Sequence, residues 1–548
     1  MTSPTVRRGS HWRAAVGRSI VIVLAGFFQI CAVVSVPYTW IKLGIPFFAA
    51  CLIPALVLGL STRRLWTSLL WWTLSSALGF SLLFAEGEVA TYPWALWEAS
   101  GASFVLFGCF AFCTVLFGFY IRRGESPKRR LLSLAAISVI LVATSSVQWL
   151  HAERWPKDFS HLSRVQAFDQ LHHLVADYYP YLDRKNIDIQ SAYDRFKGRV
   201  GDSSTELEYA RCLAEYMSVL NDGHAHVSHS GLGVRFYCRP PILLEEAEGQ
   251  VVIEKVLDPQ LSQQGVVPGL VLLSIDGTPL PDAKKNVPAF LVSGGTEACK
   301  SYRLTHWLLS GAQGTRVTLK CKTLGAKEIN FTLTRNSQVR RVDSSLEFRA
   351  LSDSIGYLRL PSFSLPDTAD FFVSKLNEIY ACRGLIIDVR GNGGGNEAVA
   401  QKINRYLFRD PVRYGQSHSE KLRHLCRRAV IHPAAKTYDG IICILVDGGC
   451  FSTCCGFLAP HIKTGRSILI GKPAGGGGGD PSHGRVKMPD DIQVRFPLTA
   501  FLDVDGRETQ ETQGYQPDIL VERTIRGISE GRDEILEAAL DYLRAELL

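Results

Sequence analysis

The stretch Ile441–Phe457, IICILVDGGCFSTCCGF, decides the fold of the second half of the chain. An apolar, β-branched segment runs into Gly448 and Gly449, and a second apolar segment begins after them with Ser452 near its start. This pattern predicts a buried strand, a glycine turn and a helix. The start of the helix would surround Ser452 with unpaired N–H groups and the positive end of a helix dipole, which suits a nucleophile whose attack creates an oxyanion. The alternative is that Ser452 only caps the helix.

Strand and helix patterns alternate on both sides of this stretch from Ser354 onward. Two strand patterns, IGYLRL and GLIIDVR, precede it, each followed by a helical pattern, and the strand pattern SILIG follows it. Repeated βαβ units predict a mainly parallel sheet with functional residues at the carboxyl ends of its strands.

The glycine turn GNGGG follows one of these strands and has two interpretations. It is either an ordinary tight turn or a backbone that comes close to Ser452 and donates N–H groups. G-K-[ST] and GxGxxG are both absent, which disfavours a phosphate-binding loop. We therefore predict an oxyanion hole with one donor from Gly393 or Gly394 and another from the N–H of Thr453.

The first 150 residues differ in composition from the rest. They contain five apolar segments long enough, or nearly long enough, to cross a bilayer, namely Ala15–Val36, Ile45–Leu60, Leu65–Phe84, Gly101–Tyr120 and Leu131–Leu150. Eleven Lys and Arg residues lie in or beside the N-terminus and the second and fourth loops, whereas the first and third loops carry only Lys42. The positive-inside rule places the N-terminus in the cytoplasm and all residues after 150 outside. We predict a multi-pass anchor in the bilayer, with no ionisable residue deep in a span to support transport.

The charge and the cysteines narrow the function classes further. The net charge is +8, but much of the basic excess lies beside the apolar segments, so nucleic-acid binding is not predicted. The chain has 14 cysteines and no CxxC pair. The ten cysteines after residue 150 would permit disulfides in an oxidising compartment, although the sequence does not give their pairing.

Three histidines follow a predicted helical region and its stop at Asn221–Gly223. They are His224, His226 and His229 in SVLNDGHAHVSHS. The H-x-H spacing places two imidazoles on one face of a strand, as in some zinc sites, but no obvious carboxylate completes the ligand set and H-E-x-x-H is absent. We predict no metal and no other cofactor. A catalytic histidine and a plain exposed loop remain the alternatives.

Short strand patterns with turn signals occupy roughly residues 234–335. The stretch from Pro268-Gly269 to Ile275-Asp276-Gly277 resembles a PDZ domain, whose strands flank a groove that accepts a peptide by strand addition. The alternative is an unrelated β insert.

Together the order of these motifs resembles the C-terminal processing and tricorn-core serine peptidases, from about Phe159 to the end. The shared features are a helical cap, the D-G-H turn, a PDZ-like insert, GLIIDVRGNGGG, the serine helix and GYQPDI. Processing peptidases place a lysine base about 25 residues after the serine, and here Gly477 stands there. Tricorn-core enzymes use a histidine from the D-G-H-type turn and a late glutamate, which His224 and Glu511 match. The resemblance implies a Ser452–His224–Glu511 triad.

Two departures from the family pattern affect this interpretation. Cys455 stands where the family usually has a glutamate, and Gly475–Gly479 forms a pentaglycine loop. G-x-S-x-G is absent, so an α/β-hydrolase is excluded. Cys454 or Cys455 as the nucleophile is an alternative, because a helix N-terminus lowers a thiol pKa.

The sequence thus predicts an α-helical membrane domain (1–150), a helical cap with the His-bearing turn (157–230), a PDZ-like β domain (231–340) and a ClpP/crotonase-like βαβ peptidase core (341–548). The predicted function is a membrane-anchored serine endopeptidase that acts on extracytoplasmic or membrane-associated polypeptides. The competing hypotheses are a catalytically inactive peptide-binding module and a metal hydrolase that uses His224 and His226.

Overall fold

The structure is a computed structural model that describes residues 155–232, 237–338, 345–352 and 354–548. The five predicted membrane spans lie outside these residues. Among the described residues, no helix combines the length and the apolar character needed to cross a membrane. Residues Glu153–Leu548 form one compact unit, which contains the cap, the β domain and the core.

The cap is a layer of three helices, α7 (Arg164–Tyr178), α8 (Ile189–Gly201) and α9 (Glu206–Ser218). Capping boxes start α7 and α9, in which Ser163 pairs with Gln166 and Thr205 with Glu208. The helical spacing predicted in α7 is present, because Phe168, Leu171 and Val175 are fully buried in the cap core.

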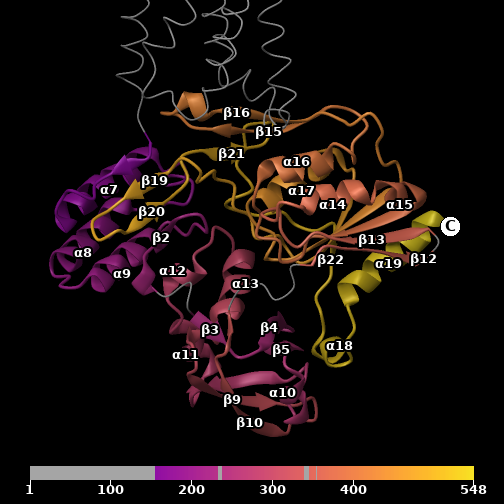
Figure 1. Cartoon of the computed structure of the whole chain (residues 1–548), viewed down its shortest axis with the longest axis horizontal. Coiled ribbons are helices and arrows are strands. Elements are labelled where there is room, and N and C mark those ends of the chain that lie inside the picture. Colours follow the sequence, from indigo (N-terminus) through magenta and orange to yellow (C-terminus); the bar gives the residue numbers. More distant parts are fainter. Residues whose placement is uncertain (1–154, 233–236, 339–344, 353) are drawn as a thin grey trace, which may run out of the picture. The chain divides into compact units, whose positions relative to one another are not determined.

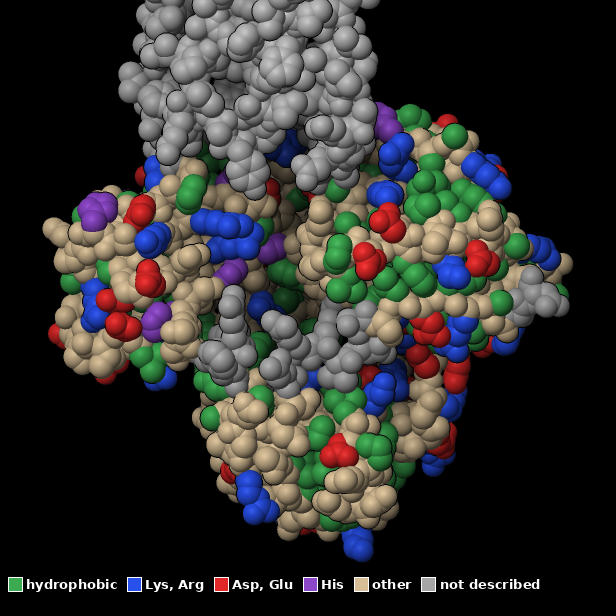
Figure 2. Space-filling model, viewed as in Figure 1, with side chains coloured by type: hydrophobic (Ala, Val, Ile, Leu, Met, Phe, Trp, Pro, Cys, Tyr) green, Lys and Arg blue, Asp and Glu red, His purple; other side chains and the backbone are tan. Residues whose placement is uncertain are grey.

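The cap includes a hairpin from much later in the chain, within the range that the sequence analysis placed in the peptidase core. Its four-stranded sheet has the order β1-β19-β20-β2, and the strands are Lys157–Asp158, Arg485–Lys487, Gln493–Arg495 and His226–Ser228. The buried face of the hairpin belongs to the same apolar core as the cap helices. On the surface between cap and core, beside β19 and β20, Lys and Arg side chains gather (Figures 1 and 2).

The β domain lies at residues 237–338 and has an antiparallel sheet of order β10-β9-β6-β5-β4. These strands are β4 (Ile242–Ala247), β5 (Gln250–Val256), β6 (Val271–Ile275), β9 (Arg316–Lys322) and β10 (Glu328–Thr334), with β7 (Thr278–Pro279) paired to β6. Asp276 and Gly277 both have positive φ in the two-residue turn between β6 and β7, which explains the D-G pair there. The strands predicted for this region are therefore present, and the assignment as PDZ stays a prediction.

Shorter elements complete the β domain. A small sheet has the order β11-β3-β8, formed by Ser337–Gln338, Tyr237–Arg239 and Gly311–Ala312. The helices are α10 (Pro259–Gln263), α11 (Leu280–Lys285), α12 (Ala289–Val292) and α13 (Glu297–Trp307). A Cβ atom at Gly448 or Gly449 would touch residues of α13, so this helix packs against the turn that precedes Ser452.

The core is a six-stranded sheet of order β12-β13-β14-β17-β18-β22, parallel except for β12. Its strands are Glu347–Ser352, Ile355–Arg359, Gly384–Asp388, Ile441–Val446, Ile468–Gly471 and Ile519–Leu520. Alternate residues of β17 enter the two apolar layers on either side of the sheet, Ile444 in one and Leu445 in the other. The predicted parallel sheet is thus present, and β17 is its Ile441 strand.

Helices cover both faces of this sheet (Figure 1). On one side are α14 (Thr368–Ser374), α15 (Leu376–Ala381), α16 (Glu397–Asn404) and α17 (Thr453–Thr464), and on the other is α19 (Glu534–Leu547). The continuous helix predicted after IGYLRL is divided into α14 and α15 at Lys375. The remaining elements are the sheet β16-β15-β21 (Arg427–Ile431, Val412–His418, Ala500–Leu502), the 3₁₀ turns Ser230–Leu232 and Arg423–Leu425, and α18 (Ile525–Ser529).

Candidate active site

Ser452 lies at the carboxyl end of the central strand β17, where the chain turns into α17. It occupies the N-cap position, but its side chain makes no capping hydrogen bond. Its backbone has φ 59° and ψ −124°, a region that costs a non-glycine residue about 1–3 kcal/mol. The surrounding turns hold it in this strained conformation, in part through the Ser452 N–H, which donates to Gly476 O at 2.7 Å. This geometry resembles a nucleophile turn more than an ordinary cap.

His224 comes from the turn after α9 and meets Ser452 across the cap–core boundary. Its Nε2 lies 2.8 Å from Ser452 Oγ, although the two residues are 228 positions apart. The imidazole packs against the Phe451 ring with centroids 4.7 Å apart. A Cβ atom at position 223 would come within 2.6 Å of that ring, so the glycine of the D-G-H turn permits the approach.

The backbone around His224 is fixed by Asp222, whose role the sequence analysis did not predict. The His224 N–H donates to Asp222 Oδ1 at 2.7 Å. The same carboxylate oxygen lies 3.8 Å from His224 Nδ1, which is buried and has no hydrogen-bond partner in the described part of the chain. Asp222 is fully buried, and its Oδ2 accepts a hydrogen bond from the Tyr179 hydroxyl at 2.8 Å.

Glu511 belongs to the same buried cluster. One potential ligand atom from each of Asp222, His224 and Glu511 lies within 4.8 Å of the others. Glu511 is fully buried and makes no direct hydrogen bond to His224. Its Oε2 accepts from the Gly478 N–H at 3.1 Å, and its Oε1 accepts from Lys185 Nζ at 2.6 Å.

Lys185 joins these groups and was also absent from the sequence-based site. Its ammonium donates to Glu511, to the Tyr179 hydroxyl at 3.0 Å and to the carbonyls of Leu220 and Asn221 at 3.2 and 2.9 Å. It also lies 4.0 Å from Asp222 Oδ2. One buried cation thus faces two buried carboxylates next to the imidazole.

Burial sets the protonation of the imidazole and of the glutamate. Desolvation lowers the pKa of His224 to about 4, against the opposing effects of the Asp222 and Asp480 carboxylates. The imidazole is therefore neutral near pH 7 and can accept a proton. Desolvation and the negative charge of Asp222 raise the pKa of Glu511, while Lys185 and the Gly478 N–H oppose this rise.

The cluster has donor atoms of the kinds that bind a divalent cation, namely carboxylate oxygens and an imidazole nitrogen. The ammonium of Lys185, however, already lies between the two carboxylates and supplies their counter-charge. The donor set therefore suits a lysine-neutralised acid pair better than a metal. His226 is not part of the cluster, and its Nδ1 lies 3.1 Å from His224 O.

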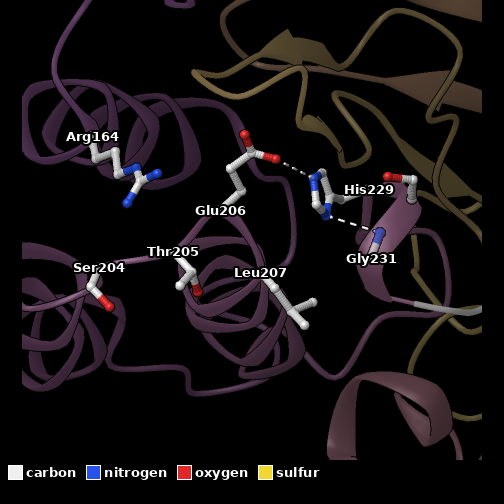
Figure 3. A pocket seen from close by; sticks show the side chains of 8 residues that line it. Arg164, Ser204, Thr205, Glu206, Leu207, His229 and Gly231 are labelled. Atoms are coloured by element: carbon white, nitrogen blue, oxygen red, sulfur yellow. Dashed lines mark hydrogen bonds and ion pairs between the residues drawn. The ribbon is translucent and has the colours of Figure 1, made fainter.

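The third histidine of the motif, His229, lies in a separate surface pocket of about 630 Å³ (Figure 3). Its Nε2 faces Glu206 at 3.8 Å, and the Gly231 N–H donates to its Nδ1 at 3.2 Å. The pocket opens at the start of α9 beside Arg164, which is itself paired with Asp490 at 2.8 Å. His229 therefore belongs to this pocket and not to the cluster of Asp222, His224 and Glu511.

The glycine turn after β14 lies directly against the serine turn. A Cβ atom at Gly394 would come within 2.7 Å of the Thr453 nitrogen and 2.9 Å of Ser452 Cβ, so only glycine allows this contact. The Gly394 N–H donates to Asn392 Oδ1 at 2.9 Å and is thereby engaged. Gly393 is exposed beside it, and the Thr453 N–H is one of the first-turn amides that find no acceptor within α17.

The structure explains why this chain has no lysine base at the position that processing peptidases use. A Cβ atom at Gly477 would lie 2.5 Å from the Phe451 ring, and the residue has φ +86°, so a lysine there would be strained. Lys472, the nearest lysine in sequence, instead donates to Glu245 of β4 at 2.7 Å.

The cysteines near Ser452 are buried. The Cys455 thiol lies 3.3 Å from Cys450 O, and burial raises its pKa well above the usual value, which disfavours the thiolate. The ten cysteines in the described residues are free, so none of them forms a disulfide.

Comparisons with known proteins found relatives for both the cap and the core. Residues 354–521 match the family model of peptidase family S41, and residues 160–218 match that of the tricorn protease C1 domain. The carboxy-terminal processing protease CtpB of Bacillus subtilis is 24% identical over 247 residues, which are 44% of this chain and 49% of that protein. The tricorn protease of Thermoplasma acidophilum is 28% identical over 199 residues, 35% of this chain and 17% of that protein. The chain thus spans about half or less of these curated relatives.

Among solved structures, mature CPAF complexed with lactacystin has a TM-score of 0.55 at 15% identity, and the match covers 70% of this chain and 97% of that one. At this identity the likeness concerns the fold. The segment that holds Ser452 and the Ser452–His224 contact is therefore similar to a class of serine-type peptidases. More particularly, most of the core matches peptidase family S41, and most of the helical cap matches the tricorn protease C1 domain.

Proposed function

We propose that this chain is a serine endopeptidase in which Ser452 is the nucleophile and His224 the general base. The observation that carries the proposal is the 2.8 Å contact between Ser452 Oγ and His224 Nε2 in a site where the imidazole is held neutral. Nucleophilic catalysis by serine requires a base within this distance.

The geometry supports a sequence of steps. Ser452 Oγ attacks the peptide carbonyl carbon while its proton passes to His224 Nε2, and the carbonyl oxygen becomes an oxyanion. The N–H groups of Thr453 and Gly393 are the candidate donors to that oxyanion. His224 then gives the proton to the leaving amine, which leaves an acyl-enzyme. Water, deprotonated by the same imidazole, hydrolyses that ester and restores the serine.

The orienting acid is a pair of carboxylates in this proposal. Asp222 Oδ1 lies 3.8 Å from His224 Nδ1. Glu511 belongs to the same cluster but is further from the imidazole than Asp222 is. The negative charge of Asp222 stabilises the imidazolium that forms during the reaction.

Asp222→Asn is expected to lower kcat more than Glu511→Gln. Asparagine keeps an oxygen for the His224 N–H and removes the charge nearest the imidazole, so we expect a loss of about 10²- to 10⁴-fold. Steady-state kinetics on both variants, with circular dichroism to verify folding, measure the difference. A larger loss in Glu511→Gln would show that Glu511 is the main orienting acid.

We extend the proposal to location and substrate. The charge bias of the predicted spans supports a multi-pass anchor in the bilayer with the peptidase outside the cytoplasm. The substrates would then be exported or membrane-associated polypeptides, and the β domain, if it acts as a PDZ domain, would hold their chain ends by strand addition.

A fluorophosphonate probe tests the nucleophile. The full-length chain is expected to react covalently with the probe, Ser452→Ala to lose the label completely, and Cys455→Ala to retain it. Mass spectrometry of the labelled peptide identifies the modified residue. Label on Ser452→Ala but not on Cys455→Ala would favour a thiol nucleophile, and a folded wild type without label would favour the non-catalytic peptide-binding module.

A further inference from the structure

The solvent face of the cap sheet carries a row of positive side chains. Arg485 of β19 lies directly opposite Arg495 of β20, and Arg495 lies opposite His226 of β2. Lys487, two residues after Arg485, projects from the same face of β19. Arg485, Lys487 and His226 are exposed, while the alternate residues of these strands are buried in the cap core.

Two arginines directly opposite each other in a sheet repel, and this arrangement costs stability. Within the residues that the structure describes, neither arginine nor Lys487 forms an ion pair, although Arg495 Nε donates to Pro481 O at 2.9 Å. Partial burial and the charge of Arg485 lower the pKa of Arg495. Two acids interact with this face: the charge of Asp480 opposes the lowering of the Arg495 pKa, and Lys487 helps to lower the pKa of the Asp158 carboxyl. They leave an excess of positive charge on this face.

This cationic face leads directly to the catalytic residues. His226 follows His224 by two residues, so their Cα atoms are at most about 7 Å apart. Arg495 lies opposite His226 on the next strand, about 5 Å away. Arg303 of α13 adds a fourth positive side chain, since its guanidinium approaches Gly223 and donates to Ser293 O. Figure 2 shows Lys and Arg side chains gathered beside a hollow between the cap and the core.

We infer that the face formed by Arg485, Lys487 and Arg495 binds acidic side chains of the polypeptide substrate. An extended peptide advances about 3.3 Å per residue, so carboxylates within about four or five residues of the scissile bond reach the arginines. Arginine pairs well with carboxylates, and a row of like charges gains most from an anionic partner that relieves its repulsion. The inference rests on the proposed peptidase function. An anionic lipid surface is the competing partner, and the continuity of the row with His224 favours the peptide.

The test uses the full-length chain and two quenched-fluorescent peptide libraries with randomised central residues. One library carries Glu-Glu on both flanks, and the other carries Gln-Gln. We expect kcat/KM to be about tenfold higher for the Glu library at low ionic strength, and the ratio to approach one as salt screens the charges. In the double variant Arg485→Gln/Lys487→Gln the ratio falls to about two. Lys327→Gln/Arg526→Gln, which removes two exposed positive charges elsewhere, keeps it.

Equal turnover of both libraries by the wild type, or an unchanged ratio in the double variant, would overturn the inference while the peptidase function stands. If neither library is cleaved, the peptidase proposal fails separately. Binding of a fluorescein-labelled tetraglutamate peptide to Ser452→Ala, compared with its tetraglutamine analogue, then decides the inference. Equal affinities, together with binding to phosphatidylserine vesicles that the double variant loses, would identify a lipid-contact surface instead.

Discussion

Replacement of His224 by alanine is expected to lower kcat/KM for peptide hydrolysis by about 10⁴-fold or more, because the serine then loses the base that takes its proton. Steady-state assays of wild type and variant on one fluorogenic peptide measure the loss. His229→Ala is the matched control, since His229 pairs with Glu206 in a separate pocket. A loss of less than about tenfold in His224→Ala would remove His224 from the proposed mechanism.

The pH dependence of kcat/KM in the wild type tests the protonation of the same residue. Desolvation lowers the pKa of His224 to about 4, so the acid limb of kcat/KM is expected near pH 4 and not near 6.5. The shift also affects stability. Above pH 6.5 the imidazole is neutral in both states, but below it the unfolded chain takes up a proton first, so this stability is lost as the pH falls from 6.5 through 4. An acid limb at pH 6.5 would show a hydrated, ordinary imidazole.

Lys185→Met is expected to destabilise the folded protein by about 3–5 kcal/mol, because it leaves the buried carboxylates of Glu511 and Asp222 without their counter-charge. Denaturant unfolding at several pH values measures the loss. Burial raises the pKa of Glu511, so any stability linked to its protonation is present below about pH 4.5 and is lost as the pH rises through the folded pKa. The variant is therefore expected to suffer most in alkaline solution and least near pH 4.

Two further variants separate charge from packing. Lys185→Arg keeps the cation and is expected to retain more of the stability than Lys185→Met. The double variant Lys185→Met/Glu511→Gln is expected to recover part of the loss, because the glutamine carries no charge to neutralise. If the double variant is as unstable as the sum of the two single variants, the ion pair is not the source of the effect.

The core sheet and its serine turn were predictable because their signals are local. The apolar run Ile441–Val446 followed by two glycines predicts a strand and a turn, and β17 and the start of α17 lie close to the predicted positions. The strands β15 and β16 were not predicted, since their sequences show no strong periodic pattern. The break between α14 and α15 at Lys375 was not predicted either.

The candidate site was predictable only in part. The order of motifs pointed to Ser452, His224 and Glu511, and the structure brings them to one place. Glu511 lies in the cluster with His224 but makes no direct hydrogen bond to it. Asp222 was visible in the D-G-H motif but was interpreted only as a turn residue. Lys185 gave no signal at all, because a single lysine in a polar loop is ordinarily solvated. Its burial depends on contacts with Glu511 more than 300 residues later in the chain.

The pairing of the late hairpin with the cap determines when the site can be assembled during synthesis. His224 is translated long before Arg495, yet its neighbouring strand β2 gains its partner β20 only when the hairpin has been made. During synthesis, the apolar core of the cap therefore stays incomplete until about residue 500 has been translated. The Ser452–His224 pair can form only after residue 452 has been translated, and the strand that follows His224 gains its β20 partner only about 40 residues later.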